Sequence, residues 1–345
     1  MLDEIERIVS FGIRRPGYDE GLKTEQYLLE RFNEIGLIDT RLEPVPVNYW
    51  RPSATRLAVG DAAEDIPCFA VPYTGWTSHG GAQAGAVYVG AGSDEAFDAE
   101  DVSGKLVVAD MHFGELNAAH LKSGSRFIHD PGGTIPDGPL HCANWLIPNF
   151  RAYYEAWKRD ASGFIGLLGE MPIDGCELYV PYDGFLKKAP AAWVGREHSA
   201  AIRSAVTNGE PFHFTSTGKG GTIDSHNVVG ILPGRTDEYI LLTCHHDAPF
   251  ASAVEDSSGL SVLLALAKAY AQSGEPLERG LIFLASSGHF HGGIGCREFV
   301  AKHRGGLLEK IVVAIGVEHI AEEARGGNDG RYVKTGQAET RALFV

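Results

Sequence analysis

The stretch that decides the fold reads Tyr239-Ile-Leu-Leu-Thr-Cys-His-His-Asp-Ala-Pro-Phe-Ala-Ser-Ala-Val-Glu-Asp-Ser-Ser-Gly259. Its apolar beginning predicts a buried strand that ends at His245, His246 and Asp247. A loop follows, and Asp256 then opens a segment that we expect to be helical from Ser257. Imidazole and carboxylate groups are thereby brought to one edge of a sheet, which suggests a metal site.

The composition is that of a globular chain with room for two domains. The 345 residues are 44% hydrophobic and 22% charged, and a chain of this length exceeds one small domain. The formal charge of −15 argues against a nucleic-acid partner, because such binding rests on clustered Lys and Arg. No apolar stretch approaches the roughly 20 residues that span a bilayer. The acidic start lacks the basic segment of a signal peptide, so we expect a cytoplasmic location and no membrane partner.

The five cysteines are scattered and never form a CxxC pair. This spacing argues against a disulfide framework and against a thiolate zinc knuckle. We therefore expect reduced thiols, with Cys244 buried at the end of its strand.

From Ser225 onward, apolar strands alternate with amphipathic helices. Helices between fully apolar strands predict an α/β fold, a mostly parallel sheet covered by helices on both faces. The expected strands are Asn227 to Leu232, Tyr239 to Cys244, Leu281 to Ala285 and Ile311 to Val317, and the expected helices are Ser257 to Gln272 and Gly293 to His303.

The middle of the chain has a different texture, with short apolar runs between Gly, Pro and Asp. We expect residues 50–215 to form an inserted β-rich domain, and residues 1–49 and 216–345 to form the α/β domain. The long Gly-rich segment 112–147 is a candidate lid with His141 and Asn144 as its polar groups, although a solvated surface loop fits equally well. The expected strands of the insert are Ala86 to Val89, Leu106 to Ala109, Gly163 to Leu168 and Ala191 to Val194, with helices at Phe150 to Arg159 and Glu197 to Val206.

Candidate metal ligands follow successive strands of the α/β domain. In open α/β sheets, ligands bind beyond the carboxyl ends of the strands. The residues expected at this rim are His245, Asp256, His289, His291, Glu318 and His319. So many nitrogen and carboxylate groups in one place would be costly to bury without a cation among them.

Each residue also has a simpler interpretation. Asp256 suits a helix N-cap, where Asp is favoured. His245 and His246 suit strand-end histidines that bond to the backbone, and Glu318 suits an ion pair with an arginine. A single metal site at one edge of the sheet would explain the positions of all these residues at once, and we therefore favour it over the separate interpretations.

Three motifs follow one another from Asn227 onward: Asn227-Val228…Leu232-Pro233-Gly234, His245-His246-Asp247 and Ser252-Ala253-Val254-Glu255-Asp256-Ser257-Ser258-Gly259. Their order and spacing, up to about Glu322, resemble the zinc-dependent aminopeptidases related to glutamate carboxypeptidase. That family has an Asn-Val…Leu-Pro-Gly strand, then His-x-Asp, then Gly-Ala-x-Asp-Asn-x-Ser-Gly, and this chain is one residue longer before Asp256. Arg14-Arg15-Pro16-Gly17 resembles the start of such a peptidase, and Val102 to Val108 with the Ala161 to Leu168 strand resembles a protease-associated domain.

The resemblance implies a role for each matching position. His245 binds a metal, Asp247 orients that histidine, Asp256 bridges two metals, and Glu318 replaces an aspartate ligand of the first metal. The implied cofactor is one or two divalent ions, zinc or else Mn²⁺ or Co²⁺. Two metals that share a carboxylate can lower the pKa of a bound water and polarise a peptide carbonyl.

Two departures from the family pattern affect the other half of the site. The family's Glu-Glu-x-Gly-Leu-x-Gly-Ser supplies a general base and a metal ligand, whereas this chain has His289-Phe290-His291-Gly292-Gly293-Ile294-Gly295-Cys296. His289 replaces the base, or His289 or His291 supplies a ligand of the second metal. The family's last histidine ligand has no counterpart before Val345, so the chain is a fragment or the second site is incomplete.

The sequence thus favours a metal-dependent exopeptidase-type hydrolase that cleaves peptide or small amide bonds. One alternative is a degenerate peptidase that binds such a ligand without hydrolysis. Another is an amide hydrolase or cyclase of different specificity, since one fold hosts many reactions. Serine-hydrolase and dinucleotide sites are unsupported, because no Gly-x-Ser-x-Gly elbow or G-x-G-x-x-G turn follows a strand.

Overall fold

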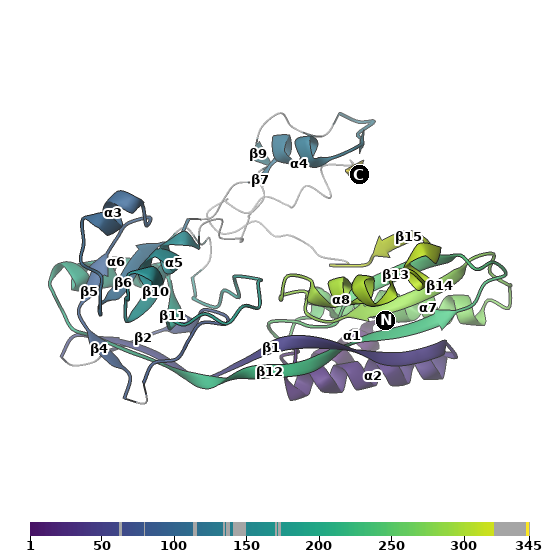
Figure 1. Cartoon of the computed structure of the whole chain (residues 1–345), viewed down its shortest axis with the longest axis horizontal. Helices are drawn as coiled ribbons and strands as arrows, with labels where there is room; N and C mark the ends of the chain where they lie inside the picture. Colours follow the sequence, from purple (N-terminus) through teal and green to yellow (C-terminus); the bar gives the residue numbers. More distant parts are fainter. Residues whose placement is uncertain are drawn as a thin grey trace. The chain divides into compact units, whose positions relative to one another are not determined.

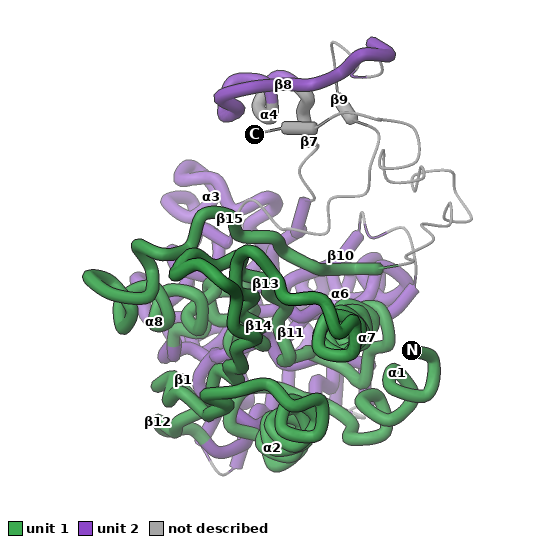
Figure 2. Tube along the Cα trace, turned by 90° about the vertical axis from the view of Figure 1, so that its right-hand side faces the viewer, with its two compact units in different colours: residues 1–49, 182–185, 220–322 green, residues 50–181, 186–219, 323–345 purple. Residues whose placement is uncertain are grey.

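The structure, a computed structural model, describes residues 1–61, 64–78, 80–112, 116–133, 135, 139–140, 150–169, 171, 174–320 and 343–344. The chain divides into two compact units (Figure 2). Unit 1 comprises Met1–Tyr49, Tyr182–Phe185 and Gly220–Glu322, and unit 2 comprises Trp50–Pro181, Leu186–Lys219 and Glu323–Val345.

The sheet of unit 1 carries the segment that decides the fold near its edge. Its strand order is β15-β13-β14-β12-β1 (Figure 1). Strand β13 is parallel to both β14 and β15, whereas β12 is antiparallel to β14. The predicted parallel sheet is therefore found for the three strands next to the candidate ligands. The strand bounds are Ile38–Val59 for β1, Phe212–Leu232 for β12, Tyr239–His245 for β13, Gly280–Ser286 for β14 and Ile311–Gly316 for β15.

Helices pack on both faces of the central strand β14, as predicted, whereas most residues of the edge strand β15 are exposed among the described residues. Side chains of a strand alternate between its two faces, and in β14 Leu281 and Phe283 pack in one core while Ile282 and Leu284 pack in the other. The first core also contains apolar side chains of the helices α1 (Leu2–Val9), α2 (Asp19–Ile35) and α7 (Gly259–Gln272). The second contains Phe299 of α8 (Ile294–His303). The turns η1 (Ala253–Ser258) and η2 (Leu307–Lys310) precede α7 and β15.

Unit 2 has its own five-stranded sheet in the order β3-β11-β10-β6-β5. Strands β5, β6, β10 and β11 run parallel, and β3 is antiparallel to β11. Every residue of β10 and β11 is buried, which explains their uninterrupted apolar sequences. The bounds are Cys68–Ala70 (β3), Ala86–Tyr88 (β5), Leu106–Asp110 (β6), Gly163–Leu168 (β10) and Ala191–Gly195 (β11), with helices Asp94–Asp98 (α3), Arg151–Lys158 (α5) and Arg196–Thr207 (α6).

The described part of the chain also contains several shorter strands and one further short helix. Strand β2 (Glu64–Ile66) pairs with β1, and β4 (Ala82–Ala84) pairs with β12. The remaining elements are β7 (Leu116–Asn117), α4 (Ala118–Gly124), β8 (Ile128–His129), β9 (Pro139–Leu140) and β16 (Leu343–Phe344). Among the helices of the described residues, none has the length and apolar character that crossing a bilayer requires.

Candidate metal centre

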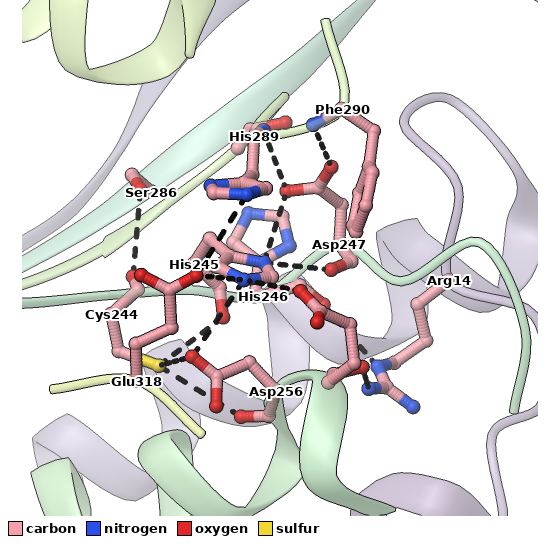
Figure 3. Close-up of polar contacts among 12 residues, drawn as sticks. Arg14, Cys244, His245, His246, Asp247, Asp256, Ser286, His289, Phe290 and Glu318 are labelled. Carbon is pink, nitrogen blue, oxygen red and sulfur yellow. Dashed lines mark hydrogen bonds and ion pairs between the residues drawn. The ribbon is translucent and has the colours of Figure 1, made fainter. Parts of the chain in front are cut away.

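Four side chains meet beyond the carboxyl ends of the parallel strands. His245 ends β13, Glu255 lies in the turn η1, His289 follows β14 and Glu318 follows β15. One potential ligand atom from each lies within 4.8 Å of the other three. His245, His289 and Glu318 are labelled in Figure 3. Because β13, β14 and β15 are parallel, residues distant in sequence reach the same rim.

Two buried atoms at the centre of this cluster lie at ion-pair distance but without the geometry of a hydrogen bond. Nε2 of His245 lies 3.0 Å from Oε1 of Glu255, yet within the described part of the chain neither atom has a hydrogen-bond partner. Nε2 of His245 is also 3.7 Å from Oδ2 of Asp256 and 3.8 Å from Oε1 of Glu318. Buried polar atoms without partners are costly, and a shared divalent cation would satisfy both. Imidazole and carboxylate groups are ordinary zinc ligands, so the residues fit such an ion.

Asp247 fixes the orientation of two parts of the cluster. The Nδ1–H of His245 donates to the backbone carbonyl of Asp247 at 2.9 Å, which turns Nε2 towards the cluster. The Asp247 carboxylate accepts from the backbone N–H groups of His289 at 3.0 Å and Phe290 at 3.3 Å. Its Oδ1 is 3.7 Å from His245 Nδ1. The carboxylate predicted to orient His245 is thus bonded to the next loop, and the carbonyl of the same residue holds the ring.

Asp256, predicted as the bridging ligand, is occupied by protein donors and lies outside the group of four. Its Oδ1 accepts from the N–H groups of Gly259 at 3.1 Å and His319 at 3.2 Å. The Cys244 thiol donates to Oδ2 at 3.2 Å. Burial raises the pKa of Asp256, and burial followed by the charge of Asp256 raises that of Cys244. The bond to the N–H of Gly259, the first residue of α7, resembles the helix-capping interaction of the simpler interpretation, although Ser258 is the N-cap residue of α7.

Glu255 takes the place in the cluster that the sequence analysis gave to Asp256. Its Oε2 accepts from Nε2 of His319, so that Oε1 faces His245. Burial alone would raise the pKa of Glu255, but His245 and His319 lower it to about 2. Burial alone would lower the pKa of His245, but Glu255, Asp247 and Asp256 raise it to about 9. The acidic surroundings therefore favour a positive charge at this point, either a proton or a metal ion.

The turn after β14 adds one polar and one apolar side chain to the rim. The His289 side chain is 38% exposed, and its Nε2 lies 3.8 Å from Oε1 of Glu318. Phe290 is buried and packs edge-on against Tyr182, with ring centroids 4.8 Å apart, and against His245 at 5.7 Å. An apolar ring therefore stands where the family pattern has a second carboxylate ligand.

His291, the other predicted ligand of a second metal, is placed outside the cluster. Its side chain is buried, and its Nε2–H donates to the carbonyl of Asn48 at 3.3 Å. Gly184 approaches its ring so closely that a Cβ there would lie 2.5 Å from the imidazole. His291 is therefore held by residues 48 and 184 and is not part of the group of four.

Glu255 was not among the ligands expected from the sequence, although a signal for it was present. Aligning Ser252-Ala253-Val254-Glu255 directly with the family's Gly-Ala-x-Asp removes the extra residue and assigns the carboxylate to Glu255. His141 and Asn144, the polar groups of the candidate lid, lie outside the described residues. His112 and His129 of the same segment are exposed.

Comparison with known proteins supports the resemblance inferred from the motifs. Residues 227–342 match the model of a family described as peptidase family M28. A glutamate carboxypeptidase 2 homolog of Caenorhabditis elegans is 30% identical over 204 residues, which are 54% of this chain and 26% of that protein. The chain thus spans about a quarter of the length of this relative. The predicted resemblance to the zinc-dependent aminopeptidases is confirmed.

Solved structures of low sequence identity share the fold. A zinc aminopeptidase from Bacillus subtilis superposes with a TM-score of 0.68 and 18% identity, over 94% of this chain and 70% of that chain. A peptidase M28 precursor from Shewanella amazonensis SB2B gives 0.68 and 18%, over 90% and 69%. An aminopeptidase from Aneurinibacillus sp. strain AM-1 gives 0.61 and 18%, over 94% and 71%. The α/β fold predicted from the sequence is confirmed.

Proposed function

We propose that this chain is a metal-dependent peptidase of the aminopeptidase type, in which His245, Glu255 and Glu318 hold one divalent cation and His289 acts as general base. The observation that carries the proposal is the buried ion pair of His245 Nε2 and Glu255 Oε1, which lie 3.0 Å apart without hydrogen-bond geometry within a four-residue cluster. The family match over residues 227–342 supports a peptide substrate. The insert of residues 50–215 is, in this proposal, a protease-associated-type domain.

The donor set favours zinc over a harder cation. One imidazole and two carboxylates resemble three-ligand catalytic zinc sites, which leave a position open for water or substrate. Mg²⁺ and Ca²⁺ prefer oxygen ligands alone, and Mn²⁺ and Co²⁺ remain compatible with this set. When bound, the cation supplies Lewis acidity, which lowers the pKa of water and polarises the scissile carbonyl.

The exposure of the side chains suggests which residues bind the metal and which one transfers protons. His245 and Glu255 are largely buried, so they suit permanent ligands, whereas the imidazole of His289 is 38% exposed and therefore accessible to water. A neutral imidazole is a suitable base near pH 7. The backbone N–H of His289 is fixed on Asp247, which positions its ring beside Glu318. His289 would accept the proton of the attacking water and transfer it to the departing amine.

We propose one metal ion and not two because of the side chains beside His289. Phe290 offers no ligand atom, and His291 bonds to the Asn48 carbonyl. Among the described residues only the one cluster has the spacing for a metal ion. A second ion would therefore lack the ligands that the family pattern gives it.

Metal analysis combined with an activity panel tests the proposal. The purified chain is dialysed against zinc, and bound metal is measured by elemental analysis for the wild type and for His245→Ala. We expect about one zinc per wild-type chain, and far less in the variant. Aminoacyl anilides and short peptides then test for turnover with Zn²⁺, Mn²⁺ and Co²⁺. A wild-type protein that binds no metal under replete conditions would refute the proposal, and metal binding without turnover would leave only a binding role.

A further inference from the structure

Arg14 is a buried cation that touches the loop carrying the candidate ligands. Its side chain is 0% exposed and lies in the connection between α1 and α2. Its Nε donates to the carbonyl of His246 at 3.2 Å, and its Nη2 donates to the carbonyls of Ser252 at 3.3 Å and Glu255 at 3.4 Å. In return, the Arg14 carbonyl accepts from the N–H of Ala248 at 3.1 Å. Figure 3 shows the guanidinium beside the turn that holds Asp256.

These bonds join both ends of the ligand loop. His246 directly follows the ligand His245, and Glu255 is itself a ligand whose main chain Arg14 holds. The loop between them contains no other regular element before η1. One planar guanidinium with several fixed donors can therefore set the distance between the His245 ring and the Glu255 carboxylate.

A purely structural explanation does not account well for a charged group at this place. Burying a guanidinium is costly unless it is paired. Arg14 forms no ion pair within the described part of the chain, its partners are carbonyl oxygens, and its Nη1 has no hydrogen-bond partner there. An apolar contact would pack the loop at lower cost. What the guanidinium adds is a fixed geometry for three carbonyls and a positive charge near Asp247, Asp256 and Glu255.

We propose that Arg14 is a positioning residue for the metal centre: by holding the carbonyls of His246, Ser252 and Glu255, it presents His245 and Glu255 to one cation and so sets the metal affinity. The inference rests on the proposed function, because it assumes that these two residues bind a metal. Partners that orient metal ligands commonly change affinity roughly 10- to 100-fold when they are lost.

Arg15 provides a matched control on the same loop. It is also buried, at 6% exposure, and its Nε donates to the carbonyl of Pro249 at 3.0 Å. The Pro249 carbonyl and the Tyr18 hydroxyl that it contacts belong to neither candidate ligand. Substituting each arginine by lysine keeps the positive charge but removes the planar guanidinium with its several donors. The two variants therefore differ in which backbone carbonyls of the loop lose their hydrogen bonds.

The experiment compares zinc affinity in the full chain for wild type, Arg14→Lys and Arg15→Lys, by competition with a chromophoric chelator. Circular dichroism and thermal unfolding of the metal-free proteins report folding separately. We expect zinc binding roughly 10- to 100-fold weaker for Arg14→Lys, and a change below about threefold for Arg15→Lys. Equal affinities of Arg14→Lys and wild type, or equal losses in both variants, would overturn the inference. A wild type that binds no zinc would instead refute the proposed function, and this inference with it.

A second variant keeps the test decisive if Arg14→Lys fails to fold. Arg14→Gln retains an amide donor but removes the positive charge. Loss of the Coulomb repulsion between Arg14 and the bound cation would, by itself, make zinc binding tighter. Weaker zinc binding by a folded Arg14→Gln protein would therefore support the positioning role, and unchanged or tighter binding would overturn it.

Discussion

The imidazole of His289 stacks on that of His245, with ring centroids 4.1 Å apart and an interplanar angle of 15°. The two rings differ in their surroundings, because the His245 side chain is 4% exposed and that of His289 is 38% exposed. The Nδ1–H of His245 donates a hydrogen bond to the backbone carbonyl of Asp247. The pair thus combines a buried imidazole with a more accessible one next to it, as the proposed roles of metal ligand for His245 and general base for His289 require.

The first prediction concerns His289. Replacing it with alanine removes the proposed base while leaving His245, Glu255 and Glu318 in place. We expect kcat to fall roughly 10²- to 10⁴-fold, with zinc affinity within about threefold of wild type. Steady-state kinetics on the best anilide substrate and chelator competition measure the two effects.

The control for this variant is His129→Ala, which removes an exposed histidine of unit 2 and should change neither quantity. A large loss of zinc affinity in His289→Ala would contradict the assignment and make His289 the fourth ligand of the cluster.

The second prediction separates two adjacent carboxylates. Glu255→Gln removes a charged ligand, so we expect zinc affinity to fall by more than about 100-fold, beyond the loss seen for residues that only orient ligands. Asp256→Asn keeps an oxygen acceptor for Gly259 and His319. Its effect on affinity should be smaller, with a loss of stability of about 1 kcal/mol. The reverse order of the two affinities would restore Asp256 as the ligand.

The sequence predicted the sheet well because its signals are local. The strands around β13 and β14 are fully apolar, and their helices show regular apolar spacing, so the rim with His245, His289 and Glu318 could be inferred without coordinates. The antiparallel direction of β12 was not predicted. Strand direction depends on the connections and on pairing partners far away in sequence, which apolar periodicity does not reveal.

The choice between Glu255 and Asp256 could not be made from residue types alone, and only the alignment of Ser252 to Glu255 with the family motif favours Glu255. Both carboxylates are adjacent, and either can bind a metal or accept backbone bonds. The main-chain path through η1, with φ −102° and ψ 89° at Glu255 and φ −128° and ψ 46° at Asp256, decides which one faces His245. The position of His291 outside the cluster could not be predicted from the sequence either, because its contacts with Asn48 and Gly184 join distant parts of the chain.

The third prediction concerns removal of the metal. A ligand that binds only the native state stabilises it by about 2.7 kcal/mol when its free concentration is 100 times Kd. Zinc should therefore raise the unfolding temperature of the wild type by several degrees, and chelation should reverse the increase. Differential scanning calorimetry with and without chelator checks this. His245→Ala should show no zinc-dependent shift, and a shift as large as that of the wild type would place the stabilising ion elsewhere.

The fourth prediction concerns acid stability and the buried carboxylate of Glu43, which accepts from Nε2 of His303 at 2.9 Å and pairs with Arg41 at 2.7 Å. Burial alone would raise the pKa of Glu43, but the His303 hydrogen bond and the Arg41 charge lower it below the ordinary 4.5. A lowered folded-state pKa contributes stability above the unfolded value of 4.5, and this contribution is lost as the pH falls through the folded-state value. Glu43→Gln should therefore lower the free energy of unfolding by about 1–3 kcal/mol at pH 7, and the difference from wild type should shrink below about pH 4. Urea unfolding at several pH values measures it, and a difference that stays constant down to pH 3 would show that the charge of Glu43 does not stabilise the fold.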